Sequence, residues 1–342
     1  MLIYCNISET FPRQTSARSK QQTHDEMKRP KDEMMNLFAK TLLACAVSAA
    51  TISTAYAAEP LQVYGKLNVS AQYNDVADET ETTIQSNASR FGVKGDFDLG
   101  NDLQAFYTIE YEVDTGDDAK DNFKARNQFV GLQGHFGLVS VGRNDTMLKV
   151  SQGKVDQFGD LAGDLKNVFK GENRMAQTAT YMTPMFGDFQ VGVTYVADGD
   201  AEQNAENGVS MAATYGDADL KQTPVYAAIA YDSKVKGYDI GRATVQGKLV
   251  GVVLGGMYQQ QEKLDSGITD NGYLLSAAYG INDVTLKAQY QDMDNKGDSW
   301  SVGADYKLAK PTKLFAFYTT NAWYESGDMD DSYLGLGLEH KF

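Results

Sequence analysis

Hydrophobic and polar residues alternate along most of the chain beyond residue 60, and the segment that ends at Phe342 shows the pattern most clearly. One face of this segment carries Leu334, Leu336, Leu338 and His340, and the other carries Tyr333, Gly335, Gly337, Glu339 and Lys341. Strict alternation predicts a β-strand with one apolar face and one wet face. A half-buried edge strand of a β-sandwich would show the same pattern, so this segment alone leaves both architectures open.

Residues 103–113 repeat this division into two faces. The odd-numbered positions, from Leu103 to Val113, are apolar or tyrosine, whereas the even-numbered positions include Thr108, Glu110 and Glu112. The first face suits lipid with an aromatic girdle, and the second suits a water-filled channel.

Sixteen strand-like segments follow one another after residue 60. They cover residues 61–73, 88–99, 103–113, 126–135, 138–143, 177–182, 189–198, 209–216, 225–232, 243–249, 252–262, 272–281, 284–292, 300–308, 313–324 and 332–342. Bacterial barrels have an even number of strands, which brings both chain ends to one side. The connections alternate between short turns and longer acidic or polar loops, at 74–87, 114–125, 144–176, 199–208, 233–242, 263–271, 293–299 and 325–331. We therefore predict an all-β fold, a 16-stranded antiparallel transmembrane β-barrel over residues 58–342, with short periplasmic turns and long extracellular loops.

Residues 35–57 have the composition of an export signal. A short basic start ends at Lys40, a small apolar stretch follows, and residues 55–57, Ala-Tyr-Ala, fit a small-x-small cleavage site. We expect cleavage before Ala58. Residues 1–34 lack periodicity and carry mixed charge, so we interpret them as an upstream extension from a start codon assigned too early.

Both cysteines, Cys5 and Cys45, precede the expected cleavage site. A lipoprotein with Cys45 as the lipidated residue is the alternative, but few apolar residues separate Lys40 from Cys45 and a better cleavage site follows. The mature chain would then have no cysteine, and its stability would depend on hydrogen bonds and packing.

Charge and hydropathy exclude two classes of protein. The first 57 residues hold seven basic and five acidic residues, so the remaining chain carries a net charge of −17, against −15 for the whole. This acidity argues against a nucleic-acid partner, which requires a basic surface. No window approaches the ~18 apolar residues of a membrane helix, whereas a barrel strand needs apolar residues only at alternate positions.

The chain resembles the Gram-negative general diffusion porins from about residue 61 to 342. The resemblance rests on short motifs in a fixed order: Leu-Gln-Val-Tyr-Gly-Lys at 61–66, Ser-Arg-Phe-Gly-Val-Lys-Gly at 89–95, Arg-Asn-Gln-Phe-Val-Gly-Leu at 126–132, Val-Gly-Arg-Asn at 141–144, Val-Gly-Ala-Asp-Tyr at 302–306, and the terminal Phe342. It implies a homotrimer in contact with outer-membrane lipid and lipopolysaccharide. It also implies that Phe342 is an assembly signal read by the barrel-assembly machinery.

The family resemblance further implies a constriction, in which an inward-folded third loop opposes an acidic edge to a row of basic residues on the wall. Transferred to this sequence, the basic row is Lys66, Arg90, Arg126 and Arg174. Alternation independently places Arg90 toward the lumen, because Phe91 and its apolar partners occupy the opposite face. An arginine facing lipid near mid-bilayer would cost roughly 2–4 kcal/mol. Solvated surface charges or ion pairs at strand ends are the alternative for all four residues.

The predicted third loop, the longest connection, supplies the acidic edge. Asp156, Asp160 and Asp164 recur every four residues, and Phe158, Leu161, Leu165 and Phe169 are spaced for a short helical turn packed on the wall. On such a turn the three carboxylates would project together, which is unfavourable unless cations face them. A calcium site is the alternative, but the spacing lacks the ligand pattern of an EF-hand. In enteric porins this loop commonly contains the sequence Pro-Glu-Phe-Gly-Gly. Residues 156–159 match it only in part, which bears on the direction in which the loop points.

The predicted function is passive diffusion of ions and small hydrophilic solutes through a water-filled channel with a weak cation preference, without cofactor, metal or catalytic residues. A channel specific for sugars or anions is the alternative, although the wet face offers few aromatics and the chain is acidic. An outer-membrane enzyme would need a nucleophile and a base, but the mature chain has only His135 and His340. A purely structural anchor is a further alternative. It would be an eight-stranded barrel with a periplasmic domain, whereas this chain shows sixteen strand-like segments.

Overall fold

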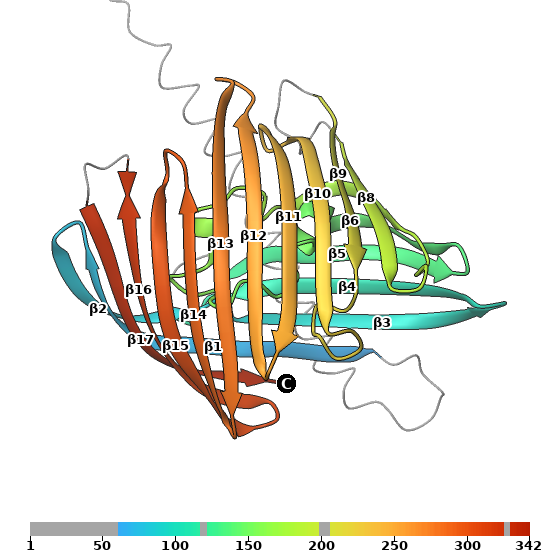
Figure 1. Ribbon diagram of the computed structural model, residues 1–342. Coiled ribbons are helices and arrows are strands. Elements are labelled where there is room, and N and C mark those ends of the chain that lie inside the picture. Colours follow the sequence, from blue (N-terminus) through green and yellow to red (C-terminus); the bar gives the residue numbers. More distant parts are fainter. Residues whose placement is uncertain (1–60, 117–121, 198–205, 325–328) are drawn as a thin grey trace, which may run out of the picture. The chain divides into compact units, whose positions relative to one another are not determined.

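The computed structural model describes residues 61–116, 122–197, 206–324 and 329–342. The predicted upstream extension, 1–34, and signal peptide, 35–57, lie outside these residues. The described chain is almost entirely β-sheet (Figure 1). Its strands are β1 (Gln62–Val76), β2 (Glu79–Ser86), β3 (Arg90–Gly100), β4 (Leu103–Val113), β5 (Phe123–Gly134), β6 (Gly137–Asp145), β7 (Arg174–Met182), β8 (Phe189–Val196), β9 (Gly208–Tyr215), β10 (Val225–Val235), β11 (Tyr238–Leu249), β12 (Val252–Lys263), β13 (Ile268–Ile281), β14 (Val284–Met293), β15 (Gly297–Ala309), β16 (Thr312–Trp323) and β17 (Met329–Lys341).

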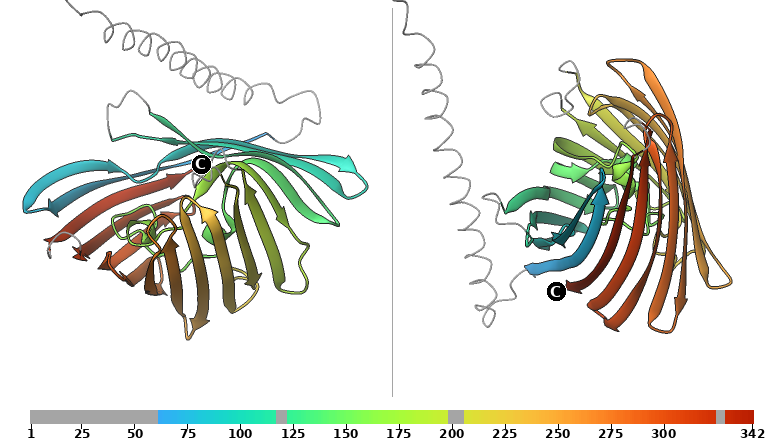
Figure 2. Two further views of the ribbon diagram at one scale, coloured as in Figure 1. Left: turned by 90° about the horizontal axis from the view of Figure 1, so that it is seen from above. Right: turned by 90° about the vertical axis from the view of Figure 1, so that its left-hand side faces the viewer.

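The sheet closes on itself through its first and last strands. From β3 to β17, each strand pairs antiparallel with the next, and β17 pairs with β1 from Lys66↔Lys341 to Asp75↔Ser332. On its other side β1 pairs with β2 and β3. Closure gives every strand two neighbours and removes the unpaired edges of an open sheet. The view from above in Figure 2 shows the strands surrounding an interior that holds the long β6–β7 connection.

The strand segments β2 and β3 share one position in the wall. The upper part of β1 pairs with β2 and its lower part, Gln62–Lys66, pairs with β3. The break falls at Ala88, which has a left-handed φ of 50°. Where the ladder is interrupted, Ser89 Oγ accepts a hydrogen bond from the Asn68 backbone N–H at 3.0 Å. Seventeen strand segments therefore occupy sixteen positions, and the predicted closed 16-stranded antiparallel barrel is confirmed.

Four connections expected to be long are short in the structure. Strands extend into 74–87, 233–242, 263–271 and 293–299, and leave turns of two to four residues. In the first of these, Ala77 and Asp78 form the turn with φ values of 52° and 64°. The predicted alternation of short turns with long loops therefore needs correction. The strand ends there carry polar residues on both faces, as in β2, so alternation of hydrophobicity gives no signal.

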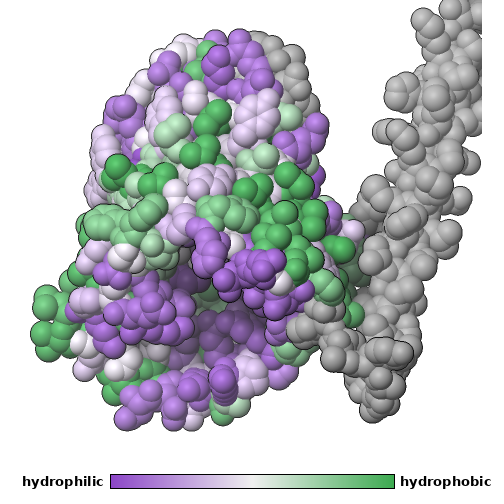
Figure 3. All heavy atoms as spheres, turned by 90° about the vertical axis from the view of Figure 1, so that its right-hand side faces the viewer, coloured by the Kyte–Doolittle hydropathy of each residue, from purple (hydrophilic) through white to green (hydrophobic). Residues whose placement is uncertain are grey.

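The outward face of the barrel is apolar. Along β17, Leu334, Leu336 and Leu338 are 56%, 65% and 44% exposed, whereas the inward Glu339 is 7% exposed. Aromatic pairs also lie on this face, and the ring centres of Trp300 and Tyr318 are 5.4 Å apart. Figure 3 shows hydrophobic residues beside a hollow rimmed by hydrophilic ones. An apolar exterior around a polar interior is the pattern expected of a barrel wall in lipid.

The connection between β6 and β7 folds into the barrel and supplies seven of the twenty buried apolar residues of the described chain. Phe158 packs on Phe315 and Phe317 of β16. Leu165 and Phe169 belong to another cluster, with Val155, Val168, Met257, Leu274 and Met293. Leu161 is partly buried against the first cluster. All four loop residues therefore pack against the wall as predicted.

The connection contains two short helical segments, α2 (Met147–Val150) and the 3-10 helix η1 (Leu165–Asn167). Within the described ranges, no helix combines the length and apolar character needed to cross a membrane.

Candidate pore constriction

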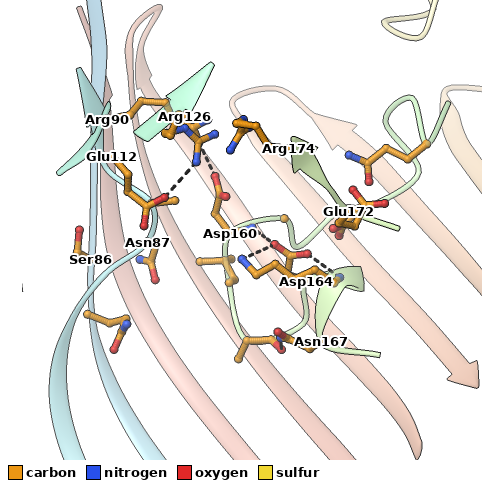
Figure 4. Close-up of a pocket in the computed structure, with 18 of the residues that line it drawn as sticks. Ser86, Asn87, Arg90, Glu112, Arg126, Asp160, Asp164, Asn167, Glu172 and Arg174 are labelled. Atoms are coloured by element: carbon orange, nitrogen blue, oxygen red, sulfur yellow. Dashed lines mark hydrogen bonds and ion pairs between the residues drawn. The ribbon is translucent and has the colours of Figure 1, made fainter. Parts of the chain in front are cut away.

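A cavity of about 1110 Å³ lies beside the inward-folded connection, 146–173, which we call the inner loop. Residues of β1 to β7, the ends of β16 and β17, and the inner loop line it. Its lining includes Arg90, Arg126 and Arg174 of the expected basic row and all three aspartates of the expected acidic edge. Figure 4 shows the three arginines along one side and Asp160 pointing toward Arg90 and Arg126.

Asp160 is the loop carboxylate that reaches the wall. Its Oδ2 lies 2.8 Å from Lys66 Nζ and 2.6 Å from Arg90 Nη2. Its φ of 68° is left-handed, a conformation that aspartate tolerates better than most residues. Desolvation alone would raise the pKa of Asp160, but Lys66 and Arg90 outweigh it and hold that pKa below its usual range. The carboxylate therefore stays ionised between two cations.

Asp156 and Asp164 do not project with Asp160, so the prediction of three carboxylates on one helical face is wrong. Asp164 accepts the backbone N–H groups of Asp160 at 2.8 Å and Lys166 at 2.9 Å. Asp156 accepts those of Phe158 at 2.9 Å and Leu165 at 3.2 Å. The stretch is a series of turns, because these side chains satisfy backbone donors that a helix would have used. Both carboxylates hold the shape of the loop around Asp160.

The environment of Asp156 differs from that of Asp160. Burial, followed by repulsion from Asp164, raises the pKa of Asp156 to about 7. No basic side chain has a salt bridge with it among the described residues. Asp156 therefore changes its charge near neutral pH, and Asp160 does not.

Arg126 and Arg174 are paired with acids of the same wall. Arg126 Nε lies 2.6 Å from Glu110, and its Nη1 lies 3.1 Å from Glu112. Arg174 Nη2 lies 3.0 Å from Asp145. The sequence had placed Glu110 and Glu112 on the wet face of their strand, but it gave no sign of these pairings, which depend on strand register. Much of the positive charge in the row is thus neutralised locally.

A chain of ion pairs continues from Lys66 around the inside of the wall. Lys66 lies 3.6 Å from Glu339, Glu339 lies 3.9 Å from Lys313, and Lys313 lies 2.9 Å from Asp305. Asp305 also lies 3.0 Å from Lys287. The charges alternate in sign across β1, β17, β16, β15 and β14. The sequence did not predict this series of ion pairs, although alternation puts Glu339 on the wet face.

Arg242 of β11 fixes both ends of the inner loop. Its side chain is fully buried and donates to Glu172 at 2.7 Å and to the carbonyls of Leu148 and Lys170 at 3.2 Å. It also donates to Gln259 at 2.8 Å. A buried guanidinium with this many acceptors is stable only while they remain in place. The loop is therefore bound to a particular part of the wall.

Wall glutamines hold the middle of the inner loop by its backbone. Gln289 accepts the N–H of Gln157 at 2.8 Å and donates to the carbonyl of Gly163 at 2.9 Å. Gln246 accepts the N–H of Lys154 at 3.2 Å. Such bonds satisfy the backbone polar groups that the loop buries. Together with the apolar contacts they position Asp160 across the lumen.

Phe342 completes the closure of the barrel. Its backbone N–H donates to Gly65 O at 3.1 Å, and its carbonyl accepts from Gly65 N at 3.0 Å. Its ring lies against Gly65, where a side chain would collide with it. Among the described residues, no group of three or more His, Cys, Asp or Glu side chains could hold a metal ion.

A family model and two relatives of this chain indicate the same class of protein. A family model described as Gram-negative porin matches residues 44–322. The chain is 26% identical over 340 residues to major outer membrane protein P.IB of Neisseria meningitidis, covering 90% of this chain and 99% of that protein. It is 28% identical over 321 residues to outer membrane porin protein 32 of Delftia acidovorans, covering 81% and 87%.

Solved porin structures share the fold. An anion-selective porin from Comamonas acidovorans superposes with a TM-score of 0.67 at 21% identity, covering 83% of this chain and 100% of that one. A Salmonella typhi OmpF complex with daunomycin superposes with a TM-score of 0.66 at 14% identity, covering 82% and 97%.

Proposed function

The chain belongs to the Gram-negative porin family, and on that premise we propose that Asp160, Lys66 and Arg90 form the charged constriction of its diffusion channel. The protein is an outer-membrane β-barrel through which ions and small hydrophilic solutes pass passively. The observation that carries the proposal is the contact of one loop carboxylate with two wall cations at 2.8 and 2.6 Å.

Opposite charges across a narrow aqueous gap produce a field transverse to the pore. Polar solutes that can align their dipoles pass, while apolar or bulky solutes meet desolvation and steric costs. The bonds from Arg242, Gln289 and Gln246 support a fixed loop, so selection follows from pore size and lining charge. Arg126 and Arg174 extend the positive side of the gap, and Asp156 and Asp164 brace its negative side.

Basic and acidic side chains line the cavity in equal numbers. Seven are basic and seven are acidic: Arg90, Lys124, Arg126, Lys149, Lys154, Lys166 and Arg174 against Glu112, Asp114, Asp145, Asp156, Asp160, Asp164 and Glu172. Ion selectivity is therefore weak. The chain beyond the expected cleavage site carries −17, so we propose a modest cation preference that grows as salt is diluted and screening weakens. The anion selectivity of the Comamonas porin belongs to that protein, which is 21% identical to this chain.

Single-channel recording in planar bilayers tests the proposal. We expect ohmic conductance steps in KCl and a small cation-directed reversal potential across a salt gradient. Clear anion preference, or an absence of any effect of substitutions at Asp160 and Arg90, would contradict the proposed constriction.

We also propose that the protein is a homotrimer whose apolar outer wall contacts outer-membrane lipid and lipopolysaccharide. One related Vibrio cholerae structure, with a TM-score of 0.60, is a trimer form. The terminal Phe342 serves as the assembly signal for the barrel-assembly machinery, and the signal peptide that directs export is cleaved before Ala58. Mass photometry in detergent and N-terminal mass spectrometry of the membrane-extracted protein test the trimer and the cleavage site.

We assign no catalytic residue. His135 Nε2 lies 3.0 Å from Asp102 in an exposed turn, and His340 Nδ1 lies 2.8 Å from the hydroxyl of Thr312 at the end of β16. We interpret both contacts as structural pairs near strand ends.

A further inference from the structure

One side of the cavity is lined by uncharged polar and aromatic side chains, which we call the amide wall. It consists of Gln72, Asn74, Asn87, Asn321, Trp323 and Tyr333. The charged residues of β3 to β7 line the adjoining part of the cavity, and Figure 4 shows Asn87 next to Glu112 and away from Arg174. The proposed constriction explains the role of the charged residues in the cavity, but it gives the amide wall no role.

Strand register brings the amide wall together from distant parts of the chain. Tyr333 of β17 pairs directly with Asn74 of β1 on one side and with Thr319 of β16 on the other. Asn321 pairs with Asp331 one step further along the inward face. Trp323 follows Asn321 on that same face, because side chains two residues apart in a strand point the same way. The six residues therefore form one continuous surface.

Two amide oxygens in this surface have no hydrogen-bond partner within the described part of the chain. Asn321 Oδ1 and Asn74 Oδ1 are both buried from bulk solvent, with their residues 3% and 7% exposed. Buried polar atoms in folded proteins nearly always have a partner. Both residues line the cavity. These two acceptors at the lining of the cavity are thus unused by the described chain.

The two aromatic rings beside these amides are held in place. Trp323 Nε1 donates to Asp331 Oδ2 at 2.6 Å, which fixes the orientation of the indole. Tyr333 packs against the cluster of Phe158, Phe315 and Phe317. Both rings are half-buried and line the cavity next to polar groups. Lys296 Nζ lies 5.2 Å from the centre of the Trp323 ring.

We propose that the amide wall is a weak binding subsite for neutral polyhydroxylated solutes of the size of a short oligosaccharide. The apolar C–H faces of such a solute pack on Trp323 and Tyr333, and its hydroxyls donate to Asn321 and Asn74. Neutral solutes suit this surface because its six residues are uncharged. The inference rests on the proposed diffusion channel only in requiring that solute reach the cavity.

Current recordings with maltotriose as probe test the subsite. In 1 M KCl we expect the wild-type conductance to fall along a saturating curve as maltotriose is added, beyond the linear decrease caused by viscosity. Asn321→Leu, which keeps the branching of the side chain but removes the amide, should raise the half-saturating concentration about three- to tenfold, as expected for losing one or two hydrogen bonds. Trp323→Leu should raise it similarly.

Gln104→Leu is the matched control. Gln104 is also an amide on the inward face, but it pairs with Gln133 at 2.6 Å and lies outside the cavity lining. Its half-saturating concentration should stay within about twofold of the wild type. If Asn321→Leu does not assemble, Asn321→Ser removes the same acceptor with less disturbance.

A purely linear response of the wild type to maltotriose would overturn the subsite. Equal half-saturation in the wild type and in the Asn321 and Trp323 variants would do the same. Failure of the wild type to conduct ions at all would instead count against the diffusion channel, so the two failures are distinguishable.

Discussion

Asp160→Asn is expected to move ion selectivity toward anions. The substitution keeps the side-chain shape and the left-handed backbone, which asparagine tolerates, but it removes the charge between Lys66 and Arg90. A unit charge acting on a passing ion ~6 Å away through water is worth about 0.7 kcal/mol, a factor of about 3 in local ion concentration. Cations are depleted and anions enriched by the same factor, so the cation-to-anion permeability ratio should fall about tenfold at most.

The assay is the reversal potential across a KCl gradient in planar bilayers near 0.1 M salt, where the Debye length is about 10 Å. Repeating it near 1 M, where that length is about 3 Å, should reduce the shift. Asp265→Asn is the matched control, because it makes the same charge change at an exposed pair with Lys263. An unchanged reversal potential for Asp160→Asn, or an equal shift for both variants, would refute the placement of Asp160 in the ion path.

Four further outcomes follow from the same contacts. Arg90→Ala should enlarge the single-channel conductance and move the reversal potential further toward cations, because it removes both bulk and positive charge; a smaller or unchanged conductance would contradict this. The pKa of Asp156 is raised to about 7, so its carboxyl gains negative charge between about pH 6 and pH 8. Cation preference should therefore increase over that interval, and Asp156→Asn should abolish the increase. Deleting Phe342 should lower the amount of folded protein in the outer membrane without blocking export, because it removes the last two backbone bonds between β17 and β1; unchanged surface levels would count against this. In detergent the protein should migrate as a heat-modifiable trimer, and mass photometry showing only monomer would defeat the proposed assembly.

The wall of the barrel could be predicted from sequence wherever one face meets lipid. In β4 and β17 the apolar residues alternate without interruption, so the strands and their two faces follow directly. The prediction failed at β2, where the residues of Glu79–Ser86 are polar on both faces apart from Ile84. A strand that extends past the bilayer has no apolar face to reveal it.

The candidate site was predictable only in part. The structure brings Lys66, Arg90 and Asp160 together, and alternation had already placed Arg90 on the wet face. Asp156 and Asp164 could not be assigned from spacing, because their roles depend on which backbone N–H groups the turns expose.

The partners of the remaining basic residues were beyond the reach of the sequence. Arg126 meets Glu110 and Arg174 meets Asp145 through strand pairings that include irregular registers. A shift of one residue in either ladder would turn one partner to the other face. Predicting which side chains pair across a barrel wall therefore requires knowledge of the strand register.

The measurement that tests the account most directly is the single-channel conductance of the wild-type protein in planar bilayers, with its reversal potential followed as salt is diluted. We predict ohmic steps that scale with salt concentration and a modest cation preference that increases on dilution. Absence of channel steps, or a clear anion preference at every salt concentration, would contradict it.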